Sequence, residues 1–354
     1  MRVLTRTNIP AVYLWSAEHR ETGLSANAYL ACTSAGNALI DPLPISGEDR
    51  KALASLGPIA KIVVTTAQRE EHARALAASL DAQLVTAPAH REEILPHLNA
   101  IELPHQGASV RFALHLAPEG VIFCGDALRG APAGGLSMRS AGEYDDVKSA
   151  ALSLRRLLRP YPRAVFPAYG YPIFDGAYDA MYNLIYECAG AEMHRINLDE
   201  LEFAPYRDDR EGLPAVYRCR DAEVGFAIGA RKLGYRVSTL DPGHRFCPMH
   251  GHAREEELFF VIDGEPSVRT PSGTVRCRKG DFIALPVGAT GAHQLLNESS
   301  APATVLLLSR TEEIETCYYP DSDKYLIETG VALAHGQARR IVRASPALEY
   351  FDGE

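Results

Sequence analysis

The sequence predicts a mixed α+β protein with two domains, an α/β layered domain followed by a strand-rich sandwich or barrel. Up to about residue 190, apolar strand-like runs alternate with Ala- and Leu-rich helical stretches, which is typical of layered α/β domains. From about residue 196, short apolar runs separated by Gly and Pro recur regularly, as in β sandwiches and barrels. We therefore expect domains at 1–190 and 196–342, and a C-terminal tail at 343–354.

The elements of the first half follow from apolar periodicity. Segment 147–158 has apolar residues at helical spacing, and Pro160 and Pro162 end the predicted helix. Segments 70–80 and 178–188 are also predicted to be helices. Short apolar runs predict strands at 38–40, 61–65, 121–124 and 164–166. Residues 190–194 are expected to join the two domains.

In the second half, the short apolar runs predict strands at 224–228, 235–240, 258–262, 267–269, 282–285 and 304–308. The dipeptide Asp263-Gly264 lies between two of these runs. An Asp-Gly pair in that position is a signal for a β-hairpin turn, because glycine tolerates the backbone angles that such a turn requires.

The composition argues against several kinds of binding partner. The 354 residues carry a net charge of −9 and no long basic run, which argues against a nucleic-acid partner. No signal-peptide pattern and no apolar stretch of membrane-spanning length is present, so a membrane partner is not expected. The seven cysteines are widely spaced, without a C-x-x-C motif, which favours reduced thiols in a cytoplasmic protein.

Three histidines and a glutamate of the second half predict a metal site. His250 and His252 are one residue apart, so on a strand they point to the same face. Glu257 enters the next apolar run and can fold back beside them, and His293 is a fourth candidate further along. Three imidazoles and one carboxylate suit a divalent first-row transition metal, namely Fe, Mn, Ni, Co, Cu or Zn. Residue type alone does not distinguish between these ions.

The carboxylate of this set has neighbours that compete for the same role. Glu255, Glu256 and Glu257 are consecutive, and a shift of one residue on a strand turns a side chain to the opposite face. Glu257 is preferred because six residues separate it from Gly264, the spacing that the family resemblance given next implies. Glu255 shares its strand face, and Glu256 points away if the strand begins that early.

The second half resembles the cupin superfamily. The run from Gly243 through His250, His252 and Glu257 to Gly264 is similar to the first cupin signature, with one extra residue before His250. The run from Gly280 through Pro286, Gly288 and His293 to Asn297 is similar to the second signature, with two extra residues before His293. The resemblance implies a β jelly-roll barrel over residues 196–342 with a metal-binding or ligand-binding mouth, and a homodimer.

The first half resembles the metallo-β-lactamase fold, with most of the metal-ligand positions changed. Where that family carries H-x-H-x-D-H, residues 67–72 read Ala-Gln-Arg-Glu-Glu-His, so Glu71 replaces the Asp and His72 is kept. His105 and Asp126 match two further ligand positions, and Tyr169 replaces a histidine. The resemblance implies an α/β sandwich whose dinuclear zinc chemistry is lost, because such a centre needs several histidines.

Two hypotheses follow for these remnant positions. Glu71, His72 and Asp126, with His105, could form a residual site for a single metal ion. Alternatively, Arg69 pairs with Asp126 and supplies the positive charge that a metal would have supplied, in which case no metal is held there. The second hypothesis needs fewer assumptions, because Arg69 would bring a cation into the same pocket.

For function, the sequence favours a cupin that binds one divalent metal and a small-molecule ligand. A metal with open coordination positions is typical of an enzyme of the dioxygenase or isomerase type. The first domain would then be a catalytically inactive scaffold. The alternatives are a non-catalytic small-molecule binding or sensor protein, and a hydrolase that acts through a residual lactamase-like site.

Overall fold

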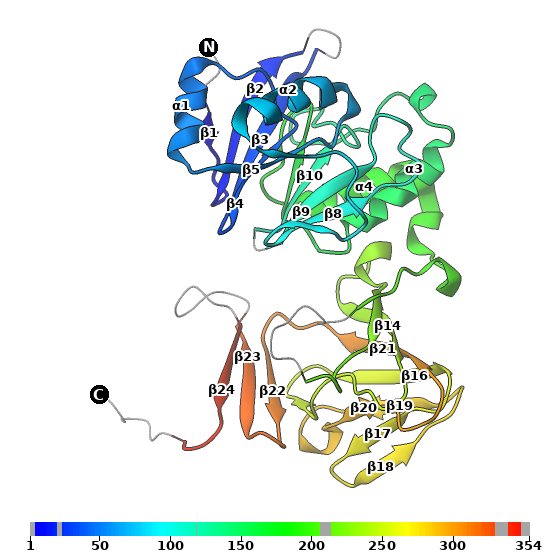
Figure 1. The fold of residues 1–354 in the computed structure, drawn as a ribbon. Coiled ribbons are helices and arrows are strands. Elements are labelled where there is room, and N and C mark those ends of the chain that lie inside the picture. Colours follow the sequence, from blue (N-terminus) through cyan, green and yellow to red (C-terminus); the bar gives the residue numbers. More distant parts are fainter. Residues whose placement is uncertain (1–3, 20–22, 118, 206–213, 330–338, 348–354) are drawn as a thin grey trace. The chain divides into compact units, whose positions relative to one another are not determined.

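The computed structural model describes residues 4–19, 23–117, 119–205, 214–329 and 339–347. The chain forms two compact units, Met1–Arg195 and Ile196–Glu354 (Figure 1). Within the described residues, none of the helices is both long and apolar enough to cross a lipid bilayer.

The first unit contains two β-sheets. Strands β1 (Thr5–Arg6), β2 (Val12–Glu18), β3 (Ser25–Thr33), β4 (Gly36–Ile40), β5 (Ile59–Val63) and β6 (Gln83–Val85) form the first sheet in that order. Strands β11 (Ala164–Pro167), β10 (Val121–Gly125), β9 (Phe112–Leu116), β8 (Leu98–Glu102) and β7 (Glu93–Leu95) form the second. One core of apolar side chains, which includes Tyr29, Phe123 and Phe166, is drawn from both sheets. The two sheets therefore pack face to face as a sandwich.

Helices cover this sandwich. Helix α1 (Gly47–Ser55) and helix α2 (Glu70–Leu80) contribute Leu53 and Leu76 to a second core, which they share with residues of the first sheet. Helix α4 (Ala177–Ala189) follows β11, and the short 3-10 helix η4 (Gly190–His194) comes directly after it (Figure 1). The predicted helices at 70–80 and 178–188 and the predicted strands of the first half are present within a few residues of their expected bounds.

The predicted helix at 147–158 is interrupted. Helix α3 (Val147–Ser153) is capped by the Asp146 side chain, and the tighter 3-10 helix η3 (Leu154–Leu157) follows it. The Ala150 carbonyl accepts hydrogen bonds from the Gln106 amide at 2.8 Å and from the Ser153 hydroxyl at 2.8 Å. These side chains compete for the carbonyl that the next α-helical turn would use, which favours the tighter turn.

The second unit consists almost entirely of strands. One sheet has the order β12 (Ala204–Pro205), β13 (Arg220–Glu223), β14 (Leu233–Leu240), β21 (Ala303–Arg310), β16 (Glu257–Asp263) and β19 (Phe282–Leu285). A second has the order β15 (Gly251–His252), β22 (Glu315–Tyr319), β23 (Lys324–Glu328) and β24 (Arg339–Arg343), and a third the order β18 (Gly273–Arg276), β17 (Ser267–Thr270) and β20 (Gln294–Leu296). Phe259, Leu295 and Leu307 belong to a core that links the first and third sheets.

Two local predictions for the second unit are wrong. The expected strand at 224–228 is the 3-10 helix η6 (Phe226–Ile228), because the Glu223 carboxylate accepts a hydrogen bond from the Phe226 amide and turns the chain. The dipeptide Asp263-Gly264 does not close a hairpin, because β16 pairs with β19 and β21 whereas β17 pairs with β18 and β20. The turn instead carries the chain from one sheet to another. Of the predicted tail, residues 348–354 lie outside the described residues, and Arg343 is the last residue of β24.

His115 makes the stability of the first unit depend on pH. Burial lowers the pKa of its imidazole to about 4, and its Nε2 atom is buried without a hydrogen-bond partner among the described residues. The unfolded chain binds a proton near pH 6.5 and the folded chain does not, so stability is highest above that pH and falls toward pH 4. The unfolding free energy of the wild type should fall between pH 7 and pH 5, and we expect His115→Gln to reduce that fall by about 1–2 kcal/mol. Urea unfolding followed by the fluorescence of Trp15, the single tryptophan, measures this; parallel wild-type and variant pH curves would contradict it.

Candidate metal centre

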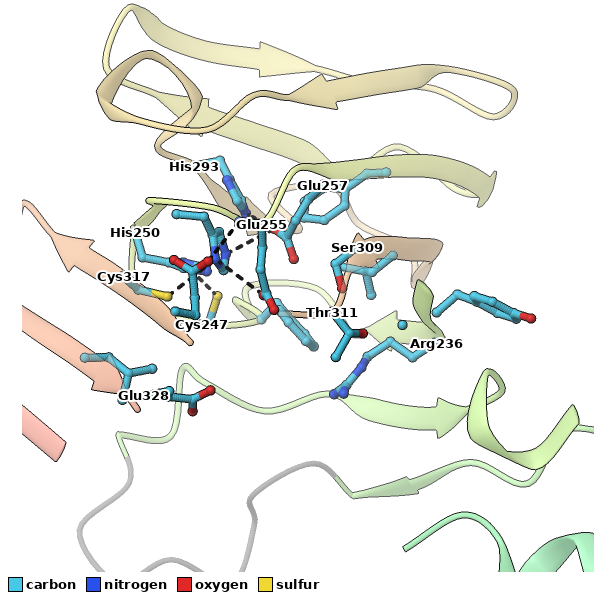
Figure 2. A pocket seen from close by; sticks show the side chains of 18 of the residues that line it. Arg236, Cys247, His250, Glu255, Glu257, His293, Ser309, Thr311, Cys317 and Glu328 are labelled. Atoms are coloured by element: carbon cyan, nitrogen blue, oxygen red, sulfur yellow. Dashed lines mark hydrogen bonds and ion pairs between the residues drawn. The ribbon is translucent and has the colours of Figure 1, made fainter. Parts of the chain in front are cut away.

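Four side chains of the second unit converge on one place. Figure 2 labels three of them, His250, Glu257 and His293. His250 directly precedes β15, His252 ends that strand, and Glu257 is the first residue of β16. His293 lies between the short 3-10 helix η7 (Ala289–Gly291) and β20. The backbones of His250 and His293 form an antiparallel bridge, with N–H···O distances of 3.0 and 2.8 Å. Sheet pairing therefore brings together residues that are far apart in the sequence.

Backbone carbonyls orient two of the three imidazoles. The Nδ1 atom of His250 lies 3.0 Å from the Pro248 oxygen, and that of His293 lies 2.9 Å from the Gly291 oxygen. A carbonyl can only accept a hydrogen bond, so each Nδ1 carries the proton and each Nε2 is the atom available to a ligand. The Nδ1 atom of His252 lies 3.4 Å from the Cys317 sulfur and 3.7 Å from a Glu255 oxygen, which again leaves Nε2 for the site.

The available atoms converge. One ligand atom from each of His250, His252, Glu257 and His293 can be chosen so that all lie within 4.8 Å of one another. The Glu257 carboxylate lies 2.9 Å from His293 Nε2 and 3.5 Å from His252 Nε2. The Nε2 atom of His252 is buried and has no hydrogen-bond partner within the described part of the chain. A buried nitrogen without a partner is costly unless something binds it, so this donor set fits a divalent metal ion.

The local electrostatics favour the protonation states that bind metal. Burial, reinforced by the neighbouring imidazoles, lowers the pKa of His250 to about 4, and burial also lowers the pKa of His252. Burial alone would raise the pKa of Glu257, but the hydrogen bond from His293 and the other nearby imidazoles hold it below its usual value. Neutral imidazoles and an ionised carboxylate are the forms in which these groups coordinate a metal.

Glu255 and Glu256, the neighbours of Glu257 in the sequence, lie outside the group of four side chains. One oxygen of Glu255 accepts a hydrogen bond from the Glu312 amide at 2.9 Å, so this carboxylate lies beside the set rather than in it. Burial, with Glu315 and Glu257 close by, raises the pKa of Glu255 to about 7. Glu256 is exposed. The structure therefore brings Glu257, and not its two neighbours, into the group with the three histidines.

A cavity of about 330 Å³ opens beside the four side chains (Figure 2). This volume lies at the lower end of the range for small-molecule sites. Its wall includes apolar groups such as Phe246, Phe259 and Leu307, and polar groups that include Glu255, Ser309 and Thr311. A small molecule placed here would lie next to the histidines.

The remnant positions of the first unit do not assemble in this way. Glu71 and His105 are exposed, His72 is half-buried, and Asp126 is buried. Within the described residues, the groups of three or more side chains that could hold a metal lie in the second unit. The residual single-metal hypothesis therefore has no assembled ligand set to support it.

The predicted pairing of Arg69 with Asp126 is wrong. Arg69 is buried as expected, but its guanidinium donates to the carbonyl oxygens of Asn27 and Asp41 at 2.6 Å and of Ala168 at 3.1 Å. Asp126 is instead bound by Arg129, with N–O distances of 2.8 and 3.1 Å. Arg129 lies only three residues from Asp126, so the local pair forms without the longer-range one.

Comparison with known families agrees with the two-unit architecture. Residues 1–184 match the family model of the metallo-β-lactamase superfamily, which is more than half of the chain. The chain belongs to the metallo-β-lactamase superfamily. Residues 236–309 match the cupin domain model. The predicted fold class, an α/β sandwich followed by a cupin jelly roll, is therefore confirmed, and the two units are called the lactamase-like unit and the cupin unit below.

Two solved structures are similar to parts of this superfamily member. A cupin-superfamily sugar phosphate isomerase from Silicibacter pomeroyi has 26% identity and a TM-score of 0.38, over 45% of this chain and 98% of that chain. A metallo-β-lactamase from Erythrobacter litoralis has 15% identity and a TM-score of 0.41, over 53% of this chain and 95% of that chain. A search of curated proteins finds no match.

In the lactamase-like unit, Arg69 is predicted to be important for folding. Burial raises the pKa of Asp41, and Arg69 and hydrogen bonds from Thr65 and Thr66 oppose that rise. Arg69→Met would leave Asp41 without this nearby cation and would remove one donor from each of three carbonyls, so we expect a loss of about 3–5 kcal/mol in unfolding free energy. Urea unfolding followed by Trp15 fluorescence measures it. The exposed Arg74→Met is the matched control and should change stability by less than about 0.5 kcal/mol; an equally small effect at Arg69 would refute the role.

In the cupin unit, sequence reasoning missed Glu315. Its buried carboxylate accepts hydrogen bonds from the backbone amides of Ala253 at 2.8 Å, Arg254 at 3.1 Å, Glu255 at 2.8 Å and Thr316 at 2.7 Å. The loop that joins His252 to Glu257 is thus wrapped around one carboxylate. Although Glu315 also lies near His252 and Cys317, its oxygens are already occupied by amides, which makes it an anchor for the loop.

No sequence signal identified Glu315, because backbone amides are present at every residue and leave no motif. Cys317 and Cys247 were missed for a related reason. Their sulfurs lie 3.4 Å from His252 Nδ1 and 3.6 Å from His250 Nδ1, respectively, and lone cysteines at wide spacing carry no pattern.

Proposed function

We propose that the cupin unit is a metal-dependent enzyme that acts on a small molecule. One divalent first-row transition metal would be held by His250, His252, Glu257 and His293. The observation that carries this proposal is the convergence of these four side chains beside a cavity large enough for a small substrate. The Nε2 atom of His252 is buried and accepts or donates no hydrogen bond within the described part of the chain, which supports a metal at this point rather than a network of hydrogen bonds.

The bound ion would act as a Lewis acid toward an oxygen atom of the substrate. The residues of the chain have separate tasks. Pro248 and Gly291 fix the orientation of two histidine rings through their carbonyls, and Glu257 contributes the negative charge that partly balances the ion. Phe246 and Phe259 contribute apolar surface to the wall of the cavity. With four protein ligands, such an ion would keep coordination positions open to substrate, and the reaction class that we propose is isomerisation or O2-dependent oxidation.

We further propose a scaffold role for the lactamase-like unit, because its remnant ligand positions are not among the groups of described side chains that could hold a metal. The described cysteines are all free thiols, which supports a reducing, cytoplasmic setting. The homodimer remains a proposal that rests on resemblance to cupins. Light scattering of the purified protein tests it, and a mass of one chain, 38.6 kDa, would argue against it.

Turnover experiments test the enzymatic proposal. Protein reconstituted separately with Fe, Mn, Co, Ni, Cu or Zn is incubated with hydroxy-carbonyl compounds, keto acids and phenols, in air and without O2. We expect conversion with at least one metal and none after chelation. Conversion only in air identifies the O2-dependent class, and equal conversion without O2 identifies an isomerase. Binding without turnover across all conditions would instead identify a non-catalytic binding protein.

A further inference from the structure

Three strands of the cupin unit are apolar on both faces. Strands β21, β16 and β19 are neighbours in the six-stranded sheet of that unit (Figure 1). Their sequences read Leu-Phe-Phe-Val-Ile at 258–262, Phe-Ile-Ala-Leu at 282–285 and Val-Leu-Leu-Leu at 305–308, without the polar alternation that an antiparallel sheet shows when one face meets water. The inner residues of these runs, such as Phe259 and Leu307, belong to the core. The outward residues of the same runs are therefore also suited to burial.

The outward residues form one continuous patch. Each patch residue of β16 is directly opposite one residue of β19 and one of β21, and residues paired in this way share a face of the sheet. The rings of Phe260 and Phe282 have centroids 4.6 Å apart, and Phe282 is 73% exposed. None of the patch residues is fully buried. We call this surface the outer patch, and its residues are Leu258, Phe260, Phe282, Ala284, Leu306 and Leu308.

The charges around the outer patch suit a second copy of the chain. The patch itself has no charged side chain, so two copies that meet face to face would bury no unpaired charge. Its border has both signs. Glu256 and Arg310 are exposed at one end, where the Arg310 amide donates to the Glu256 carbonyl, and Asp263 and Lys279 lie 3.3 Å apart at the other end. Across a two-fold axis each border meets a border of the same mixed charge, so opposite charges can pair.

The place of the outer patch in the sheet favours a separate molecule as its partner. The chain enters the cupin unit through β12, the strand at one edge of this sheet, whereas β19 is the strand at the other edge. Five strand spacings, roughly 24 Å, separate these two edges. Among the described residues, β19 pairs with β16 alone. The patch therefore reaches an open edge of the sheet, away from the point at which the preceding unit is attached.

We propose that the outer patch is the contact surface of a homodimer, in which the sheets of two cupin units pack face to face across a two-fold axis. Phe260 and Phe282 lie at the centre of the contact, because buried aromatic side chains contribute most to such interfaces. The charged residues at the border form its rim. This is the surface through which the homodimer proposed above would form, and metal binding plays no part in it.

Light scattering of the wild type and of Phe282 variants over a range of concentrations tests this surface. The wild type should have the mass of two chains, each of 38.6 kDa. Phe282→Glu places one charge from each copy in the contact, so we expect the dissociation constant of the dimer to rise at least about 100-fold. Phe282→Ser removes the ring without adding charge and should raise it roughly tenfold. Val275→Glu is the matched control, because Val275 is an apolar strand residue that is 59% exposed and lies on β18 in another sheet; this variant should remain dimeric.

The outcomes separate the surface from the other proposals. Since Phe282 is mostly exposed, neither variant should change the far-UV circular dichroism, and Phe282→Ser still tests the contact if the charged variant unfolds. A monomeric wild type overturns both the homodimer and the outer patch as its contact. A dimer that persists in both Phe282 variants, or that dissociates equally in Val275→Glu, keeps the homodimer and overturns the outer patch. Metal content, measured in the same samples, bears on the enzymatic proposal alone and should be equal in all four proteins.

Discussion

Purified wild-type protein is expected to carry about one divalent metal ion per chain, and His250→Ala/His252→Ala almost none. The double variant removes two of the four converging ligands, and we expect metal affinity to fall by more than about 100-fold. Elemental analysis after dialysis against a limited concentration of chelator measures the metal content. A chelator should also lower the stability of the wild-type cupin unit, because a ligand that binds only the folded state stabilises it.

The matched control removes two histidines from the other unit. His72→Asn/His105→Asn changes two remnant positions of the lactamase-like unit and should leave the metal content unchanged. Asparagine is chosen because His105 has a positive φ of 63°, which asparagine tolerates better than alanine. Metal that persists in the cupin double variant but disappears in this control would place the centre in the lactamase-like unit instead.

Glu315→Gln is expected to destabilise the cupin unit by about 2–4 kcal/mol and to weaken metal binding. The glutamine side chain keeps one acceptor oxygen but turns an NH2 group toward amides that can only donate. The loop 253–255 lies between two proposed ligands, so its release also loosens His252 and Glu257. Hydrogen exchange of the amides in β15 and β16 reports on this unit, whereas Trp15 fluorescence reports on the other.

The exposed Glu313 is two residues away and provides the control for Glu315. Glu313→Gln removes the same charge from the same segment without touching the buried amides, so exchange rates and metal affinity should stay close to wild type. Equal behaviour of the two variants would mean that Glu315 acts through general electrostatics and not through its hydrogen bonds.

The sequence predicted those features that repeat or alternate. The helix at 70–80 was found at its observed bounds because Ala73, Leu76 and Ala77 form one apolar face. The fold class and the two families could likewise be recognised from strand patterning and from spaced His, Glu and Gly residues. Features that depend on a single tertiary contact were missed. Gln106, together with Ser153, and Glu223 redirect the chain near 153 and 226 through a few side-chain hydrogen bonds, and no local sequence pattern marks such contacts.

The sequence also did not reveal which oppositely charged residues pair. Arg69 and Asp126 were expected to pair because both fall at remnant ligand positions. In the structure Arg69 instead binds backbone carbonyls, and Asp126 binds Arg129. The metal-ligand candidates, in contrast, could be proposed because a metal requires particular residue types at one place. Their arrangement depends on Pro248, Gly291 and Glu315. Pro248 and Gly291 act through backbone carbonyls, which every residue has, and Glu315 acts through its place in the fold, so no sequence motif marks these three residues.

The backbone bridge between His250 and His293 has a consequence for the kinetics of metal exchange. Since two reciprocal N–H···O bonds join these residues, their separation is set by sheet pairing and is already established when the polypeptide folds. The metal-free protein would then be preorganised, and an incoming ion would order few additional degrees of freedom. Uptake and release could proceed from the folded state on the time scale of ligand exchange, without unfolding of the cupin unit.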